Sequence, residues 1–296
     1  MRRFLIVLLA IVGLLAGAAW WTVGDLEHTQ LTDDVHMYAG IGGNVGVLVT
    51  RDGAVVVDTM TFVRQGDAIR AKVAELTPQP IVAVLNTHYH LDHTHGNPAF
   101  PIGTKVVSTA KTLAHLQTLD ADYWKDRPAK DLLPNDTFDG ATKEIKVGGK
   151  TVRAYYFGRG HTDGDMVVLF VEDRVLHTGD LLFNGHYPNI DLEAGGSVKQ
   201  WPATLDKVLA LPFDSVIPGH GPPASRRTVE RFRDFMTSLW TQTAQVRDRG
   251  GSLENAIQLV NLDEFGLSTL WFAPKLNRGF VINRTWEELQ TTRTNP

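Results

Sequence analysis

The sequence predicts an α/β protein in which β-sheets are covered by helices. Two observations carry this prediction. Short runs rich in β-branched residues occur in two successive blocks of the chain, and stretches with helical spacing of apolar residues lie among and after them. The chain has 296 residues, which is enough to bury a substantial core. Its 43% hydrophobic and 21% charged residues are ordinary for a globular protein and argue against a disordered chain.

The first block is predicted to contain four strands, in which Val and other apolar residues dominate. Gly, Asp or Pro lies close to most of their ends, as is usual for strands. The predicted strands span residues 45–49, 54–57, 81–85 and 106–107. A helix is predicted over 62–76, because its apolar residues recur at steps of seven, four and three, and 109–119 is a second helix candidate.

The second block repeats this pattern and ends in helices. The predicted strands span residues 152–157, 166–171, 174–177 and 214–217. Ser197, with Gln200 three residues on, is a capping-box pattern that predicts a helix with Trp201 on its inward face. A long helix is predicted over 225–249 after two prolines. We therefore expect residues 26–296 to form a single domain whose C-terminal part is helical from about residue 225.

The N-terminus predicts export from the cytoplasm. Arg2 and Arg3 precede an apolar run at 4–23, and the small residues at 16–19 fit the cleavage site of a secretory signal peptide over residues 1–19. The run is also about the ~20 residues that span a bilayer, so an uncleaved anchor reaching to about residue 23 is the alternative. Both place the rest of the chain in the periplasm or outside the cell. Membrane contact is expected only if the segment is not cleaved.

Composition excludes several classes of function. The chain has 29 Lys and Arg against 33 Asp and Glu, without the basic excess of a nucleic-acid-binding protein. It has no Cys, which removes disulfides, thiolate nucleophiles and Cys-ligated metal sites. Any metal must therefore be held by His, Asp or Glu, and the 11 His residues make this practicable.

The densest chemical signal, His88, His90, Asp92 and His93, comes almost directly after the strand predicted at 81–85. In an extended segment, residues i and i+2 point the same way, so His88 and His90 can converge on one ion. Asp92 and His93 come after the chain begins to turn, so they can face a second ion nearby. Imidazole nitrogens with a carboxylate suit zinc, and iron or manganese is possible.

Three further candidate ligands lie near the ends of strands predicted downstream. His161 lies in a loop with glycines and would be the third nitrogen on the first metal. Asp180 ends a strand, where its carboxylate could bridge two metals through one oxygen. His220, flanked by Gly219 and Gly221, would complete the second metal. The pattern therefore predicts two metal ions.

These residues resemble the metallo-β-lactamase superfamily. The family's ligand order is matched by His88-x-His90-x-Asp92-His93, His161, Asp180 and His220. The resemblance covers roughly residues 35–222, and Asp58 resembles a structural Asp found early in that fold. It implies an αββα sandwich, in which two mixed β-sheets pack face to face with helices outside and two zinc ions at one edge.

The resemblance is less specific for the substrate. Asp180 stands where many lactamases have Cys or Ser, and Phe183 lies where they carry a Lys that holds the substrate carboxylate. The pattern is closer to the glyoxalase II-like and general hydrolase branches, although the C-terminal helices show no recognisable glutathione-binding pattern. It implies an exported dinuclear zinc hydrolase that cleaves an ester, thioester, lactone or amide of a small molecule. A metal-bound hydroxide would attack, with Asp92 orienting it or relaying its proton.

Three alternatives stay open. The chain could be a β-lactamase that hydrolyses β-lactam antibiotics. It could be a mononuclear iron enzyme similar to persulfide dioxygenases, which would leave the second site empty. It could also be a non-catalytic metal-binding protein of the cell envelope, although decay of function tends to lose ligands and the set here is complete.

Several other residues near the motifs are assigned weaker roles. His95 is expected to be an outer-shell or surface residue. The stretch 120–130, with Trp124, is a candidate for a loop over the site. His186 and Tyr187 lie on a loop expected to border the metals, and their roles are left open. The basic start of the long helix, at 226–233, is expected to be a solvated face.

Overall fold

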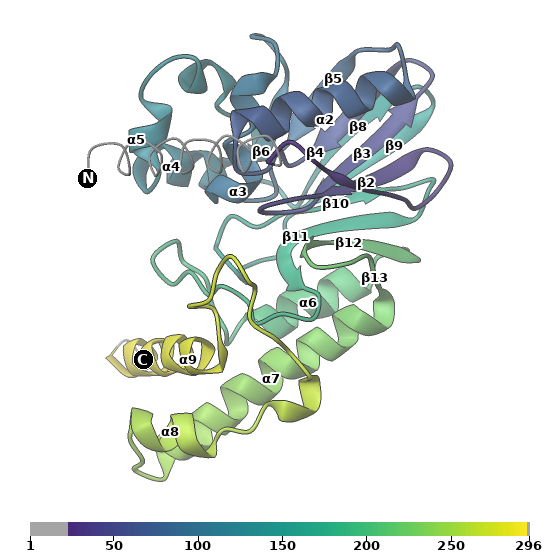
Figure 1. Cartoon of the computed structure of the whole chain (residues 1–296). Coiled ribbons are helices and arrows are strands. Elements are labelled where there is room, and N and C mark those ends of the chain that lie inside the picture. The colour runs from purple at the N-terminus through teal and green to yellow at the C-terminus, as the bar shows by residue number, and fades with distance from the viewer. Residues whose placement is uncertain (1–22, 295–296) are drawn as a thin grey trace, which may run out of the picture.

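Two β-sheets pack face to face, and helices cover the outer face of each sheet (Figure 1). This arrangement confirms the predicted αββα sandwich. The computed structural model describes residues 23–294, and the predicted signal peptide at 1–19 lies outside them. No helix in the described part of the chain is both long and apolar enough to cross a membrane.

The first sheet has seven strands that lie side by side in the order of the sequence. They are β1 (Glu27–Gln30), β2 (Val35–Ala39), β3 (Val45–Thr50), β4 (Gly53–Val57), β5 (Ile81–Leu85), β6 (Val106–Thr109) and β7 (Asp136–Phe138). The pairs from β1 to β4 are antiparallel and those from β4 to β7 are parallel. Because β4 and β5 run in the same direction, Asp58 and His88 follow them at the same edge of the sheet.

The second sheet has six strands and is also mixed. In spatial order they are β13 (Ala224–Ser225), β12 (Ser215–His220), β11 (Val175–Phe183), β10 (Val167–Phe170), β9 (Lys150–Tyr155) and β8 (Thr142–Val147). Only β11 and β12 pair in parallel. Their shared direction brings Asp180 on β11 and His220 at the end of β12 to one edge.

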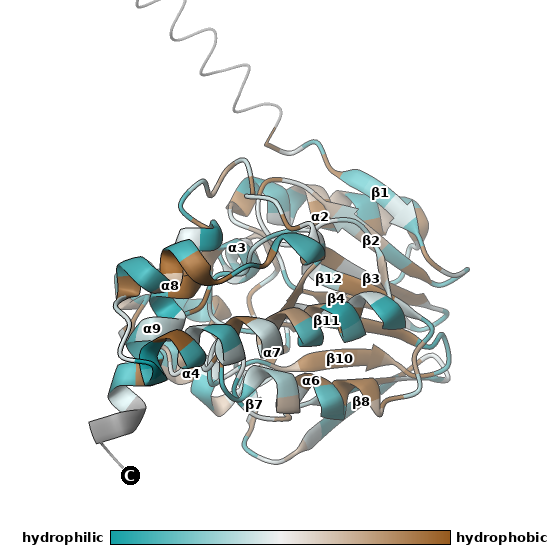
Figure 2. Cartoon of the chain, turned by 90° about the horizontal axis from the view of Figure 1, so that it is seen from below, coloured by the Kyte–Doolittle hydropathy of each residue, from teal (hydrophilic) through white to brown (hydrophobic). Residues whose placement is uncertain are grey.

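Helices lie on the outer faces of both sheets. They are α2 (Val63–Leu76), α3 (Leu91–Thr94), α4 (Ala110–Thr118), α5 (Ala121–Trp124), α6 (Trp201–Leu209), α7 (Arg226–Asp248), α8 (Leu253–Leu259) and α9 (Arg278–Thr294). Ile69 of α2 packs in an apolar cluster with the first sheet, and α6, α7 and α9 pack in another with the second. A third cluster, with Leu48 and Phe170, fills the space between the sheets. Figure 2 shows central strands such as β10 coloured as hydrophobic.

The structure differs from the predicted elements in three places. The strand predicted at 174–177 continues as β11 to Phe183, so Asp180 lies within it. Helix α6 begins at Trp201 and not directly after Ser197, although the Ser197 hydroxyl accepts the Gln200 amide at 3.1 Å, as the capping-box pattern predicts; the hydroxyl also donates to Glu288 at 2.6 Å. Between α8 and α9 the chain is mostly irregular, with one short 3₁₀ turn at Asp263–Phe265.

Candidate metal centre

A first group of ligand atoms comes from His88, His90, His161 and Asp180. His88 and His90 follow β5, and His161 lies in the loop between β9 and β10. One ligand atom from each of the four side chains lies within 4.8 Å of the others. His90 Nδ1 and His161 Nε2 are 2.8 Å apart, and the Nε2 atoms of His161 and His88 lie 3.4 and 3.6 Å from Asp180 Oδ2. The structure thus brings together the residues predicted for the first metal.

A second group comes from Asp92, His93 and His220. Asp92 Oδ2 lies 3.3 Å from His220 Nε2 and 3.8 Å from His93 Nε2. Asp180 Oδ1 lies 3.1 Å from His93 Nε2 and 3.4 Å from His220 Nε2. Asp180 therefore presents Oδ2 to the first group and Oδ1 to the second. The carboxylate thus lies between the two groups, and bridging of two metals through one of its oxygens stays a prediction.

Three buried atoms at the centre of these groups make no hydrogen bond within the described residues: His88 Nε2, His93 Nε2 and Asp180 Oδ1. Buried polar atoms are normally paired, and each one left without a partner costs about 1–3 kcal/mol. A divalent cation in each group would give all three atoms a partner. Neutral imidazole nitrogens with carboxylate oxygens are the donor set that zinc accepts. The residues therefore fit two zinc ions.

The electrostatics of the two groups differ. Burial lowers the pKa of His161 to about 4 and holds that of His88 well below its usual value, so both imidazoles are neutral donors. Burial also lowers the pKa of His220, but Asp180 and Asp92 outweigh it and raise the pKa to about 9. The second group therefore requires positive charge among its carboxylates. A metal ion would supply that charge in place of the proton.

Each of three ligand histidines is oriented by a partner on its other ring nitrogen. His93 Nδ1 lies 2.7 Å from Asp58 Oδ2, and His90 Nε2 lies 2.8 Å from Asp191 Oδ2. His161 Nδ1 lies 3.0 Å from the Asn189 carbonyl oxygen. Such partners fix the ring and leave the other nitrogen for the metal. Sequence reasoning singled out Asp58 but missed Asp191, which no local pattern marks.

Two glycines let the ligands approach closely. A Cβ on Gly219 would lie 2.0 Å from Asp180 Oδ1, and a Cβ on Gly43 would lie 2.3 Å from His93 Cε1. Neither distance leaves room for a side chain. The Gly219 next to His220 is therefore required by the packing of Asp180 against the end of β12.

A pocket of about 500 Å³ opens above the ligands. His90, Asp92, Asp180 and His220 form part of its wall, and residues from 270–276 cover them. We call residues 267–276 the strap. In Figure 1 it belongs to the yellow loop between α8 and α9, which extends from the C-terminal helices toward the sheets.

The loop expected over the site from residues 120–130 lies elsewhere. Trp124 is buried with Leu116 and Ala129, and its indole nitrogen donates to Asp120 at 2.8 Å. None of these side chains lines the pocket above the ligands. The prediction was wrong because Trp124 packs in a separate small apolar cluster that does not line the pocket. The strap covers the site instead.

The histidines with uncertain roles are structural. His95 Nε2 lies 2.7 Å from Asp120 Oδ2, and its ring stacks on Tyr123 at 3.5 Å. His186 Nδ1 lies 3.1 Å from Ser268 Oγ, which ties the loop after β11 to the strap. Tyr187 is buried and packs against Phe235. The side chains of His95, His186 and Tyr187 belong to neither of the two groups of ligand atoms.

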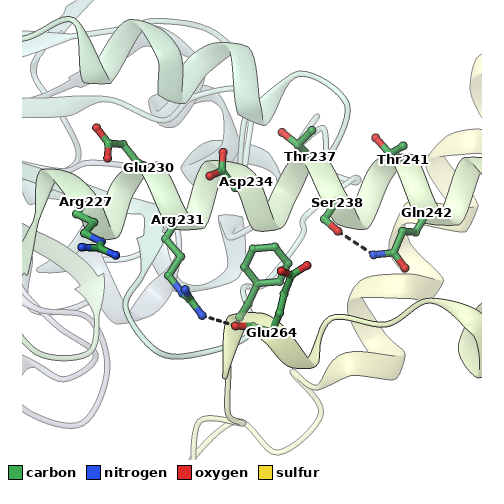
Figure 3. Close-up of a pocket in the computed structure, with 10 residues that line it drawn as sticks. Arg227, Glu230, Arg231, Asp234, Thr237, Ser238, Thr241, Gln242 and Glu264 are labelled. Carbon is green, nitrogen blue, oxygen red and sulfur yellow. Dashed lines mark hydrogen bonds between the residues drawn. The ribbon is translucent and has the colours of Figure 1, made fainter.

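At the basic start of α7, Arg226 is bonded within the protein, whereas Arg227 and Arg231 are exposed, as expected of a solvated face. Arg226 donates to three backbone carbonyls, those of Leu209, Leu211 and Phe213. Figure 3 shows Arg227 and Arg231 on the wall of a groove along α7, where Arg231 contacts the carbonyl of Glu264. This groove contains no candidate metal ligand. The arginines therefore do not contribute to the pocket above the ligands.

Comparison with known families decides the assignment of the fold. Residues 39–220, more than half of the chain, match the family model described as the metallo-beta-lactamase superfamily. The chain belongs to this superfamily. The matched segment contains all seven candidate ligands and ends at the last of them. Superfamily members include lactamases and sulfatases, so a metal-dependent hydrolase is the supported class.

Its curated relatives are distant. The 2,4-dinitroanisole O-demethylase subunit alpha of Nocardioides sp. is 29% identical, over 72% of this chain and 60% of that protein. A linear primary-alkylsulfatase of Pseudomonas sp. is 23% identical, over 71% of this chain and 48% of that protein. Metallo-beta-lactamase IND-1 of Chryseobacterium indologenes is 28% identical, over 64% of this chain and 80% of that protein. The matches thus span less than two thirds of the first two relatives.

Solved structures share the fold. The stereoselective inverting sec-alkylsulfatase Pisa1 from Pseudomonas sp. has a TM-score of 0.69 at 18% identity, covering 92% of this chain and 52% of that chain. A metallo-beta-lactamase from Pontibacter korlensis has a TM-score of 0.60 at 23% identity, covering 72% of this chain and 99% of that chain. At these identities the likeness shows the fold alone.

Proposed function

We propose that the chain is an exported dinuclear zinc hydrolase that cleaves an ester, thioester, lactone or amide of a small molecule. The observation that carries this proposal is the pair of ligand groups that face the two oxygens of Asp180, with three buried ligand atoms that make no hydrogen bond to any described residue. The names of the relatives differ widely, from a lactamase to a sulfatase to a demethylase. Membership of the superfamily therefore supports hydrolysis without choosing the bond that is cleaved.

The chain's own residues have distinct parts in this chemistry. Bound zinc ions would polarise a carbonyl oxygen and lower the pKa of a bound water molecule to about 7. Asp92 directs Oδ2 toward His220, and its carboxylate lines the pocket with 20% of the side chain exposed. Its other oxygen can orient the attacking water and accept a proton from it. His88, His90 and His161 would hold one ion, which would supply the polarisation of the scissile carbonyl.

Phe183 stands where many lactamases carry the Lys that holds the substrate carboxylate. Its ring stacks on His220, with ring centroids 4.9 Å apart, so this part of the wall offers an aromatic ring and no cation. The iron oxygenase and the non-catalytic metal protein remain rivals in a different class. They differ from the proposal in metal content and in turnover, which can be measured together.

The test combines metal analysis with a hydrolysis screen of the purified protein. We expect two divalent ions per chain, zinc above all, and turnover of at least one of an aryl ester, a thioester and a lactone, with nitrocefin included as the substrate that tests for a β-lactamase. His88→Ala should empty the first site, and His220→Ala should preferentially weaken the second. His28→Ala is the matched control, because this exposed imidazole on β1 bonds only with the side chain of His36 among the described residues.

The outcomes separate the rivals. One tightly bound iron per chain, with no change on adding zinc, would contradict the dinuclear zinc assignment. Two bound zinc ions without turnover of any substrate in the screen would favour the non-catalytic protein. Turnover of nitrocefin alone would favour the β-lactamase.

A further inference from the structure

The strap is anchored on the side of the pocket where β11 ends. The Ser268 amide donates to the Gly185 carbonyl at 3.0 Å, and the Tyr187 amide donates to the Ser268 carbonyl at 3.0 Å. These bonds form a short bridge between the strap and the loop after β11. At the other end, Leu276 is buried in the core shared with α7 and α9. The course of the strap over the ligands is therefore fixed at both ends.

The strap gives the pocket hydrocarbon walls. Phe272 faces His220, with ring centroids 5.9 Å apart, and Leu270 and Leu276 lie beside it on the wall. Ile41 and Leu91 add further apolar surface, and the Leu91 side chain is exposed. Apolar surface of this kind binds hydrocarbon because burial removes both from water.

Among the Lys and Arg residues of the described chain, Lys275 is the one that lines this pocket. The acidic residues on the pocket wall are Asp92 and Asp180, and both face the metal-ligand groups. Within the described residues, the Lys275 ammonium has neither a hydrogen bond nor an ion pair. Its charge is therefore available to a ligand that enters the pocket.

We propose that the substrate carries a hydrocarbon chain, which lies along the strap against Phe272, and an anionic group, which pairs with Lys275. This inference rests on the proposed function, because it names the substrate class of the same hydrolytic site. A carboxylate or a sulfate would supply the same anionic oxygens. The residues that select the substrate thus come from the strap, outside the segment 39–220 that matches the superfamily.

The hydrocarbon part is tested with zinc-loaded enzyme and neutral p-nitrophenyl esters of increasing straight-chain length. We expect kcat/KM to rise by about twofold to fourfold per methylene until the pocket is filled, the scale set by burying one CH₂ group. Phe272→Ala should flatten this rise. Trp271→Ala is the matched control, because the neighbouring indole is 77% exposed and does not line the pocket.

The anionic part is tested with two further substrates of matched chain length. One is an ester with a carboxylate at the far end of its chain, compared with its neutral amide, and the other is the same ester with a sulfate at that end, compared with its neutral alcohol. We expect the wild type to prefer the anionic member by about twofold to fivefold, the scale of an ion pair made by an exposed ammonium. Lys275→Gln should abolish this preference, Lys275→Arg should retain it, and Lys199→Gln is the surface control.

The results distinguish this inference from the proposed function. A flat chain-length profile of the wild type, or an unchanged anion preference in Lys275→Gln, overturns the substrate class while hydrolysis of short neutral esters still supports the hydrolase. Failure of zinc-loaded wild type to cleave any of these substrates overturns both. The chain-length profile needs no variant, so it decides the hydrocarbon part even if Phe272→Ala does not fold.

Discussion

The protonation state of single rings decides which atoms can bind metal. In His93 and His90 the nitrogen that faces Asp58 or Asp191 is held at hydrogen-bond distance, so the opposite nitrogen presents its lone pair to the ion. Asp191 also accepts a hydrogen bond from the Tyr89 hydroxyl at 2.5 Å. The ligand rings are thus set in place before any metal binds.

At the same scale, Asp92 is the residue whose charge we expect to matter most for turnover. Although burial raises the pKa of its carboxyl, His93 and His220 hold that pKa well below its usual value, so it is ionised. Asp92→Asn keeps the shape of the side chain but loses its charge and basicity. We expect kcat to fall by ~10²-fold or more, the usual scale for losing general acid–base help, with a smaller loss of metal.

Turnover and metal content must be measured on the same preparation. Wild-type turnover by Asp92→Asn with both metals bound would show that the assigned proton transfer is wrong. His28→Ala again serves as the control for substituting a residue away from the pocket.

Sequence reasoning found the candidate ligands because they form short motifs at strand ends. Their neighbours were harder to find: Asp191 and Lys275 lie far along the chain from the residues they accompany, and neither belongs to a motif. Nothing local marks a residue whose role depends on where a distant loop folds.

At the scale of elements, β11 joins the two sheets at the metal centre. His177 on this strand is fully buried, with Nε2 at 3.2 Å from the Asn44 carbonyl oxygen, and its Nδ1 accepts the Gly179 amide at 3.1 Å. The imidazole is therefore neutral and uses both nitrogens. This agrees with the packed, hydrogen-bonded histidine that its place in a strand indicates.

His177 should make the metal-free protein sensitive to acid. Burial lowers its pKa to about 4; Asp58 acts against this shift and His93 adds to it. The unfolded chain takes up a proton near pH 6.5, whereas the folded chain resists until about pH 4. The stabilisation is present above pH 6.5 and is lost as pH falls through this window, by about 3 kcal/mol in all.

Denaturant unfolding with a chelator present, at about pH 7.5 and about pH 4.5, measures this contribution. His177→Gln should lose less free energy of unfolding between the two pH values than the wild type. The exposed His28→Gln should keep the wild-type dependence. An equal pH dependence in His177→Gln and wild type would rule out the buried imidazole as the source.

Several strands escaped prediction for reasons visible in their residues. β8 alternates exposed and partly buried positions, but its side chains are mostly polar, so no apolar run marks it. β2 is almost wholly buried, yet His36 and Tyr38 interrupt its apolar residues. Strand β8 pairs with β9, and β2 pairs with β3. The sequence predicts β9 and β3 as strands, so the position of each missed strand depends on a partner that could be predicted.

At the scale of the whole molecule, the layered fold could be predicted from the order of the strands and helices in the sequence. The long helix after residue 225 could be predicted too, but the position of the strap could not. The superfamily match ends at residue 220, and α7, α8, α9 and the strap come after it. An irregular segment such as the strap has no periodicity from which its position over the pocket could be predicted. The part of the site that we expect to select the substrate is therefore the part that sequence reasoning missed.

We expect the whole protein to work outside the cytoplasm. A positively charged start followed by an apolar run is the pattern that directs a chain across a membrane, so residues 1–30 fused to a reporter active only outside the cytoplasm should give signal. The same reporter fused to residues 24–30 is the control and should stay silent. N-terminal sequencing of the exported product separates cleavage after residue 18 or 19 from an uncleaved anchor. A silent reporter, with the 1–30 fusion intact in the cytoplasm, would reject export and leave the metal centre to act inside the cell.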